Sequence, residues 1–439
     1  MTVKFLLFFE ALVYITAFVS IFRGGYKKHL PLLFVLAIMS VFYFLAPLYG
    51  YAYKIQSLFG NYLWNYYPYV LINYLFASIA ILIGYLATRT SSREVKRPPD
   101  RERTVPVKVI RGGMLIGLMF FVLWGLSTGA SLSSIFLLEY FGFAEVGSAV
   151  ADSRGNPYLL LMIEIFIPIL ALALYSKMKG RELVFWLCVT AVVYLSQGFR
   201  YRLIMLVASL LIVYLYRSQI KFTVSKVLVF IVLISLTMYS IINISNYRSD
   251  IRSSVSGSYS ERYSSGGQRE FSEIVFASTR VYLPFAALVK HMDQRDIPYG
   301  YGETMFGHIF VRMIPSFFFE DGIKPEPPAV IVSQQSWGGS RYFGAGEAYG
   351  GVGGVYYEYG TIGVVIYFII LGAILGRLTL LLNESRNQIF SVMYIVTSVA
   401  FFILITRGYL PGFFFSYCFM MIPFIFLKYF FPKRWNARA

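Results

Sequence analysis

Residues 67–87 read YPYVLINYLFASIAILIGYLA, and residues 89–111 read RTSSREVKRPPDRERTVPVKVIR. The first stretch contains no charged residue and has the length that a helix needs to cross a hydrocarbon layer about 30 Å thick. The second stretch carries eight Lys and Arg residues. An apolar run followed by a short basic connection is typical of a helical membrane protein.

The rest of the chain repeats this alternation. Of its 439 residues, 57% are hydrophobic and 14% are charged, whereas soluble domains contain about 45–50% and about 25%. The composition therefore excludes a soluble globular protein and predicts an all-α polytopic membrane protein. We expect eleven spans, near residues 3–22, 30–49, 67–87, 113–130, 157–175, 183–198, 203–217, 226–244, 361–380, 388–405 and 412–431.

We expect no signal-peptide cleavage of the first span, and no disulfide or metal binding by the two cysteines. The first span leads directly into the second without a small-residue cleavage pattern, so we expect a retained helix rather than a signal peptide. Cys188 and Cys418 fall inside apolar runs, and we interpret both as packing residues. With 2 Cys and 3 His, neither a disulfide framework nor a Cys-rich metal site is expected.

The positions of Lys and Arg predict the orientation, because these residues collect in cytoplasmic loops. If residues 89–111 are cytoplasmic, the same side contains residues 22–29, 176–182, 216–226, 377–387 and 428–439. These six segments have a net charge of +18, against −1 for the rest of the chain. The amino terminus is then external and the carboxy terminus cytoplasmic. Because the positive charge is shared among short loops, nucleic acid is not an expected partner.

The spans divide the chain into three parts. Residues 1–244 form an N-terminal bundle of eight spans, residues 245–360 a large external loop, and residues 361–439 a C-terminal bundle of three spans. Within the loop, residues 274–290 and 304–319 are apolar but interrupted by Arg and Pro. We expect interfacial or re-entrant helices there.

Several cations lie on the external side, where positive residues are otherwise depleted. Arg200 and Arg202 occupy a tight turn, GFRYRL, between two spans, and Arg407 occupies another in TRGYL. The loop adds Arg280, Arg312, Lys324 and Arg341. Guanidinium groups suit the oxygens of a lipid diphosphate. Two other readings stay open: Arg200 and Arg202 contact lipid head groups, or the cations pair with the twelve acids of the loop.

Residues 338–354 contain eight glycines and suggest a segment that brings its backbone close to a ligand. No Gly-Lys-Ser/Thr follows, so this is not a nucleotide-binding P-loop. Glu347 lies within the segment, near Arg341 and Tyr349, and is a candidate general base or a partner of an arginine. His308 is the other candidate base, although a single His is more often structural.

Two acids, Glu10 and Glu164, lie within predicted spans. They are candidates for proton coupling, but a single carboxyl at membrane depth more often stays protonated or is hydrogen-bonded within the bundle. We favour that second interpretation.

At the level of short motifs the chain resembles the Wzy-type O-antigen and enterobacterial-common-antigen polymerases. The resembling motifs are GFRYRL at 198, STRVYLPFAAL at 278, HIFVRMIPSFFFEDGIKP at 308, GEAYGGVGGVYYEYGTIG at 346 and TRGYL at 406. The resemblance implies a GT-C-like helical fold at the bacterial inner membrane, with the external side periplasmic. It assigns Arg200, Arg280, Arg312 and Arg407 to the diphosphate and glycan.

The implied reaction is an inverting, metal-independent glycosyl transfer without cofactor, in which a growing glycan moves from undecaprenyl diphosphate onto a lipid-linked repeat unit. Implied partners are the undecaprenyl-diphosphate-linked oligosaccharide, membrane lipids, a chain-length regulator and a repeat-unit flippase. The alternatives are an O-antigen ligase, a lipid-linked oligosaccharide flippase or transporter, and a silent scaffold of an export complex.

Overall fold

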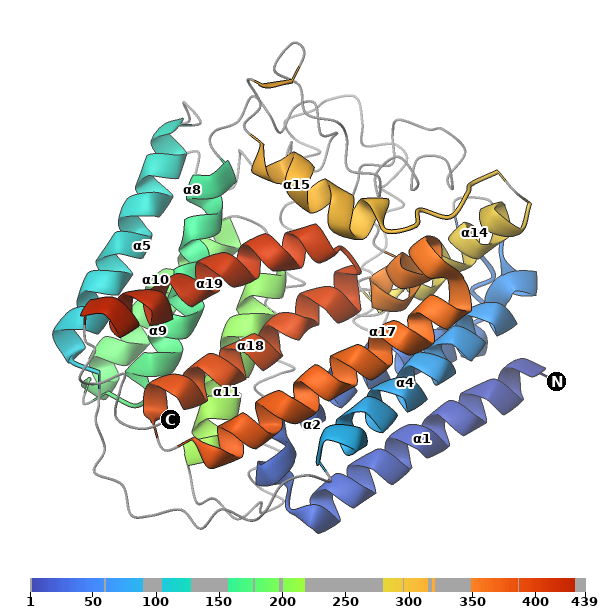
Figure 1. Ribbon diagram of the computed structural model, residues 1–439, viewed down its shortest axis with the longest axis horizontal. Helices are drawn as coiled ribbons and strands as arrows, with labels where there is room; N and C mark the ends of the chain where they lie inside the picture. Colours follow the sequence, from blue (N-terminus) through green and yellow to red (C-terminus); the bar gives the residue numbers. More distant parts are fainter. Residues whose placement is uncertain are drawn as a thin grey trace.

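The computed structural model describes residues 2–58, 61–89, 105–127, 157–176, 178–196, 200–217, 279–294, 296–314, 318–319, 349–385 and 387–430 (Figure 1). These residues are almost entirely helical. The α-helices are α1 (Thr2–Gly24), α2 (Leu30–Met39), α3 (Ala46–Ala52), α4 (Tyr67–Arg89), α5 (Val107–Ser127), α8 (Pro157–Met162), α9 (Phe166–Ala173), α10 (Gly180–Ser196), α11 (Arg200–Arg217), α14 (Tyr282–Asp293), α15 (His308–Met313), α17 (Gly350–Glu384), α18 (Gln388–Arg407) and α19 (Leu410–Phe430).

Short elements connect these helices. They are the 3-10 helices η1 (Tyr26–His29), η3 (Trp64–Tyr66) and η5 (Ile163–Ile165), and the π-helices η2 (Ser40–Leu45) and η7 (Glu303–Gly307). Strands β1 (Ser57–Leu58) and β2 (Asn61–Tyr62) form a small antiparallel hairpin with Ser57 opposite Tyr62.

Seven helices among the described residues are long and apolar enough to cross a membrane, so an all-α multi-pass membrane protein is confirmed at this level. They are Thr2–Gly24, Tyr26–Ala52, Trp64–Thr88, Val107–Ser127, Gly350–Glu384, Gln388–Arg407 and Leu410–Phe430. Three further expected spans correspond to the run α8–η5–α9, to α10 and to α11, which are shorter or carry more arginines. The expected span at 226–244 lies outside the described residues, so the total of eleven stays a prediction.

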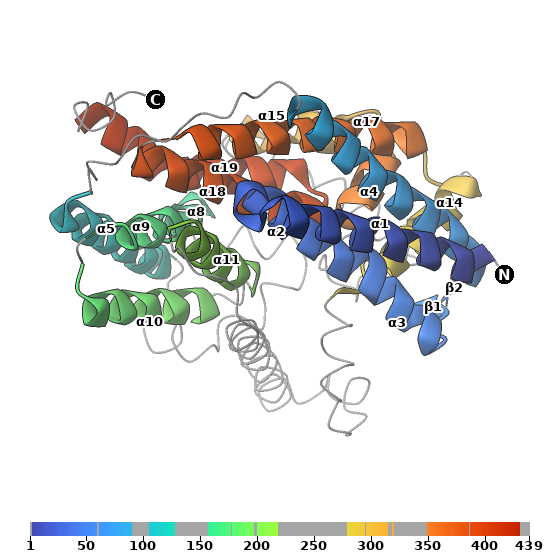
Figure 2. The same ribbon diagram turned by 90° about the horizontal axis from the view of Figure 1, so that it is seen from below.

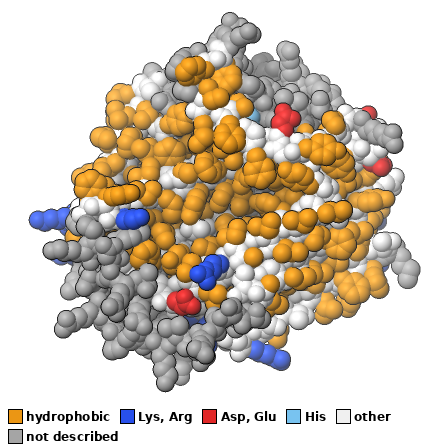
Figure 3. All heavy atoms as spheres, viewed as in Figure 1, with side chains coloured by type: hydrophobic (Ala, Val, Ile, Leu, Met, Phe, Trp, Pro, Cys, Tyr) orange, Lys and Arg blue, Asp and Glu red, His pale blue; other side chains and the backbone are white. Residues whose placement is uncertain are grey.

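The surface of the bundle suits lipid. On α1 the side chains of Phe5, Phe8 and Ile15 are exposed, whereas Leu7 and Tyr14 face the protein. A broad band of hydrophobic side chains covers the middle of the face in Figure 3, and described Lys and Arg side chains lie toward its lower left. A helix with apolar residues on its outer face needs an apolar solvent. Cys188 and Cys418, which we interpret as packing residues, are free and exposed on this outer surface.

Helices α1, α4, α17, α18 and α19 are neighbours in that order across the molecule (Figure 1). The closest pair is α4 and α17, because glycines remove side chains from their interface. A Cβ at Gly84 would meet the Ile369 carbonyl, and a Cβ at Gly372 would meet the Ile81 carbonyl. Small residues that let backbones approach are a common basis of helix association in membranes.

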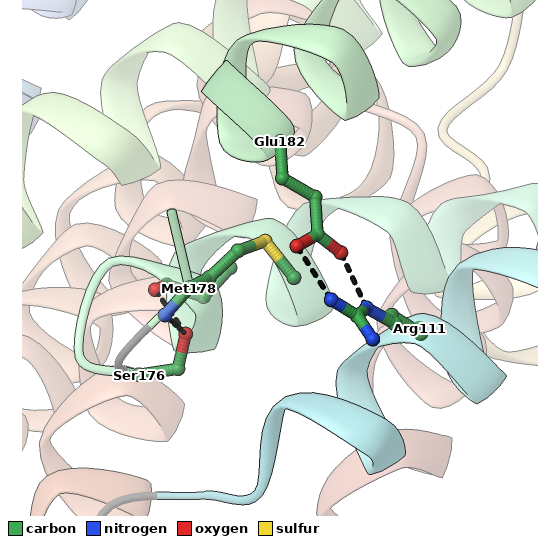
Figure 4. A network of polar contacts seen from close by, with 5 residues as sticks. Arg111, Ser176, Met178 and Glu182 are labelled. Atoms are coloured by element: carbon green, nitrogen blue, oxygen red, sulfur yellow. Dashed lines mark hydrogen bonds and ion pairs between the residues drawn. The ribbon is translucent and has the colours of Figure 1, made fainter. Parts of the chain in front are cut away.

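Connections that the charge pattern assigns to one side do lie together at one end. The Asn383 side-chain amide donates to the Lys28 carbonyl at 3.0 Å, which joins the end of α17 to the α1–α2 turn. Arg111 binds Glu182 through two hydrogen bonds of 2.5 and 2.8 Å, which join the starts of α5 and α10 (Figure 4). This guanidinium lowers the pKa of the Glu182 carboxyl. Which end faces the cytoplasm stays a prediction.

The opposite end contains the amino terminus, the β1–β2 hairpin and α14 (Figure 2). Over 274–290 we expect an interfacial or re-entrant helix, and α14 does not have the exposed face of an interfacial one. All eight residues from Tyr282 to Val289 are buried, because α4, α17 and η3 surround the helix. By contrast, α15 keeps Phe310 and Met313 exposed, as an interfacial helix would.

Helix α17 begins eleven residues earlier than the span expected at 361–380. It contains a kink at Gly360, whose φ of 65° and ψ of −163° are not helical. Only glycine adopts this conformation readily. The end of the glycine-rich segment, from Gly350 to Gly354, is therefore helical rather than an open ligand-binding loop.

Candidate functional site

Three segments meet at the start of α17, and glycines allow them to do so. A Cβ at Gly351 would contact the Leu404 carbonyl, and one at Gly354 would contact the Gly408 carbonyl, so α17 packs directly on the α18–α19 turn. Gly350 lies against Val281 on the third segment, which precedes α14. Gly408 ends α18 in the left-handed conformation with φ of 66°, which makes the turn tight.

This junction carries two of the predicted arginines. Arg407 is the last residue of α18 and is exposed, and Arg280 directly precedes Val281 and is half-buried. Arg407 also interacts electrostatically with Tyr201 near the start of α11. The convergence of these segments was not visible in the sequence, where Arg280 and Arg407 belong to motifs far apart.

Helix α15 brings a third arginine to the same turn. The Arg312 guanidinium lies 5.8 Å from the centre of the Tyr409 ring and 5.8 Å from that of Phe415. Cations at this distance are attracted by the face of an aromatic ring. Tyr158 fixes the backbone of this helix by donating to the Arg312 carbonyl at 2.7 Å. Arg312 and Arg407 therefore lie at the α18–α19 turn, and Arg280 precedes a residue that packs on Gly350, which in turn contacts Gly408.

His308 is part of this group. Its side chain is 5% exposed, and its ring centre lies 6.2 Å from that of Tyr409. Burial raises the pKa of the Tyr409 hydroxyl to about 12, while the neighbouring Arg312 guanidinium acts in the opposite direction. Tyr409 is therefore a neutral phenol at neutral pH and can donate a hydrogen bond. The arrangement offers fixed positive charge, a hydroxyl donor and an imidazole.

Arg202 is not part of the surface group, and the expectation that its guanidinium faces the exterior is wrong. Its side chain is 1% exposed and its Nε donates to Glu164 Oε1 at 2.8 Å. The Glu164 side chain is fully buried on η5. The rotation of α11 points Arg202 inward, where a buried acid matches its charge. The same pair confirms that Glu164 is hydrogen-bonded within the bundle, one of the two states expected for it.

Glu10 has a different environment. Its side chain is fully buried on α1, and within the described part of the chain neither carboxyl oxygen has a hydrogen-bond partner. An isolated ionised carboxylate at such a position is very costly, which favours a neutral acid.

The remaining predicted site residues are Tyr349, Arg200, Lys324, Arg341 and Glu347. Tyr349 is the N-cap residue of α17 and is buried, so its ring packs within the protein. Arg200 begins α11, but its side chain lies outside the described part, as do Lys324, Arg341 and Glu347. Their assignment to the substrate or to base catalysis stays a prediction.

Glu358 is a positioning residue that the sequence did not single out. Its carboxylate is fully buried and accepts hydrogen bonds from the Gly302 backbone at 2.5 Å and the Thr304 backbone at 3.1 Å. The Thr304 hydroxyl is also a donor to it. Because these residues begin η7 and lead into α15, Glu358 fixes the helix that carries His308 and Arg312. An acid two residues before the kink glycine, within an aromatic run, was the available signal.

Comparison with protein-family models, with curated proteins and with solved structures finds no match for this chain. The fold and the site together define a helical multi-pass membrane protein with arginines, a histidine and a tyrosine gathered at the end opposite the basic loops.

Proposed function

We propose that this protein is a glycosyltransferase of the bacterial inner membrane, of the Wzy-type polysaccharide polymerase class. It would transfer a growing glycan from undecaprenyl diphosphate onto a lipid-linked repeat unit at the periplasmic face. The observation that carries the proposal is that Arg312 and Arg407 lie at the α18–α19 turn, while Arg280 precedes the segment that packs on the neighbouring start of α17. Several arginines at one point suit a diphosphate, whose oxygens accept forked hydrogen bonds.

The reaction needs little beyond positioning and charge neutralisation. The acceptor hydroxyl oxygen forms a bond to C1 of the donor sugar while the bond from C1 to the diphosphate oxygen breaks, with inversion at C1. The bonding electron pair leaves with undecaprenyl diphosphate, and the arginines stabilise the charge that develops there. The acceptor proton passes to a base, for which His308 and Glu347 are the candidates.

The decisive variants are Arg407→Ala, Arg407→Lys and Arg312→Ala, expressed in host cells that lack the native gene. Polymer is expected to fall more than tenfold in both alanine variants, with single repeat units accumulating. Lysine should restore little, because it cannot make a two-pronged contact with phosphate. Arg377→Ala is the matched control, since Arg377 is exposed on α17 at the opposite end. Full polymer in both alanine variants would overturn the proposal.

An O-antigen ligase is the second candidate, favoured by the position of His308 beside Arg312 and Tyr409. A ligase transfers a finished glycan to a lipid acceptor, so its loss leaves long lipid-linked polymer in place. If His308→Ala cells accumulate long chains on the lipid carrier, the ligase is correct. A flippase would instead line a central path with cations, whereas Arg280, Arg312 and Arg407 gather at one end.

The proposal includes an orientation, with the amino terminus in the periplasm and the carboxy terminus in the cytoplasm. Lys28 and Asp296 are exposed at opposite ends of the molecule. In intact spheroplasts, an impermeant thiol reagent is expected to label Asp296→Cys but not Lys28→Cys, with wild type reporting any labelling of Cys188 and Cys418. The reverse pattern would invert the assignment of the two faces.

A further inference from the structure

A group of exposed tyrosines lies near α14 and the loop that follows it. Tyr299 and Tyr301 have ring centres 6.1 Å apart, and Tyr66 and Tyr69 have ring centres 6.5 Å apart. The half-buried Tyr356 is an electrostatic neighbour of Tyr299, Asp293 and Tyr69. Tyr69 is 57% exposed and Tyr301 is 77% exposed. Asp293 connects the two pairs, because it binds the Tyr66 hydroxyl and is also a neighbour of Tyr356.

The backbone holds Tyr301 in a conformation that an aromatic residue rarely adopts. Its φ is +47°, in the left-handed region. Two backbone hydrogen bonds to α17 impose it: Gly300 donates to the Tyr357 carbonyl at 3.1 Å, and Tyr301 donates to the Glu358 carbonyl at 3.2 Å. The buried Glu358 carboxylate then holds the next residue, Gly302. A strained residue held this firmly with its ring in solvent suggests a functional role for the ring.

Acidic groups border the tyrosines. Asp293 is exposed and its Oδ2 accepts a hydrogen bond from the Tyr66 hydroxyl at 3.4 Å. Glu303 is also exposed, two residues after Tyr301. Carboxylates repel phosphate groups but accept hydrogen bonds from hydroxyls. The surface therefore disfavours a diphosphate or an anionic lipid head group and favours a neutral ligand rich in hydroxyls.

A sugar ring has the two features that this surface can recognise. Its C–H face is weakly positive and packs on the negative face of an aromatic ring, and its hydroxyls bind carboxylates and phenols. We propose that Tyr69, Tyr299 and Tyr301, together with Asp293, form a binding subsite for a neutral stretch of glycan. This inference rests on the proposed function, in which the arginines hold the diphosphate. The subsite retains the growing chain between transfers, so its loss shortens the chains without preventing the first transfer.

The test uses two substitutions that remove rings without disturbing the fold. Tyr301→Gly suits the left-handed backbone, so this variant should fold at least as well as wild type. It is combined with Tyr299→Ala, which removes a second exposed ring. Tyr62→Ala is the matched control, because Tyr62 is 52% exposed in the hairpin at the same end but is outside the group. A tyrosine that only anchors the protein at the membrane interface would respond in the same way as the control.

Two measurements are made on each variant. In cells, the modal chain length of the lipid-linked polymer should fall at least twofold in the double variant and remain unchanged in the control. In nanodiscs, the full-length protein is titrated with the host polysaccharide after mild acid has released it from its lipid. The double variant should bind this phosphate-free probe at least tenfold more weakly than wild type.

The outcomes separate the subsite from the proposed function. Wild-type chain length and affinity in the double variant, with polymer lost in Arg407→Ala, would overturn the subsite alone. An equal effect of Tyr62→Ala, or no binding of the probe to wild type, would also overturn it. Full polymer in both Arg407→Ala and Arg312→Ala would overturn the proposed function.

Discussion

Breaking the ion pair between Arg202 and Glu164 should destabilise the protein strongly. Both side chains are almost completely buried, and Nε and Oε1 are 2.8 Å apart. Removing one partner of a buried pair leaves an uncompensated charge, which costs about 3–5 kcal/mol. This corresponds to a factor of about one hundred to several thousand in the folded-to-unfolded ratio. Arg202→Met and Glu164→Leu should each show it, as a lower unfolding temperature in detergent and a lower protein level in the membrane.

The double variant Arg202→Met/Glu164→Leu makes the test specific. Replacing both partners with apolar residues of similar volume is often neutral or stabilising, so the double variant should recover most of the stability lost in either single variant. It should also retain polymer synthesis, because both side chains are buried and neither is a proposed contact of the substrate. A double variant that folds but makes no polymer would indicate that Arg202 binds the substrate, as the sequence predicts. Single variants as stable as wild type would refute the ion pair.

Three further predictions concern other buried positions. Gly84→Leu should prevent α4 and α17 from packing and greatly reduce the folded protein recovered in size-exclusion chromatography, whereas Gly112→Leu, with open space at its Cβ, should not. Glu10→Leu should match or exceed wild type in unfolding temperature, since it removes an unpartnered buried carboxyl worth about 1–3 kcal/mol, and should leave polymer unchanged; loss of polymer would support proton coupling. Glu358→Gln replaces one of the two carboxylate oxygens that accept backbone N–H groups with an NH2 group, which cannot accept. We therefore expect destabilisation of about 1–3 kcal/mol together with shorter chains.

The helices could be predicted from the sequence because length and polarity alone determine whether a segment suits a hydrocarbon layer. The helix α4 follows the run at 67–87 to within two residues. The grouping of the loops was also predictable, because it depends on the parity of the spans and the position of Lys and Arg. Neither argument depends on how a helix is rotated about its axis.

The site depended on rotation and long-range packing, which the sequence does not encode locally. Arg202 and Glu164 are 38 positions apart, and no periodicity relates them. The glycines at 350–354 have the composition of a loop, yet they form a helix because the α18–α19 turn needs their small size. In a membrane, helix association depends on close packing rather than on hydrophobicity. A run of glycines can therefore indicate a closely packed helix as well as a loop.

The first turns of α17 connect the two proposed subsites. Its Gly350 and Gly354 contact the segments that carry the arginines, whereas Glu358 holds the loop that presents Tyr301. Eight residues of helix separate Gly350 from Glu358, a rise of about 12 Å. A helix of this kind holds its two ends at a constant spacing, so a diphosphate at one end and glycan at the other would be held in a fixed relation. Lengthening this segment by a full turn should therefore change the chain-length distribution even when every proposed contact residue is retained.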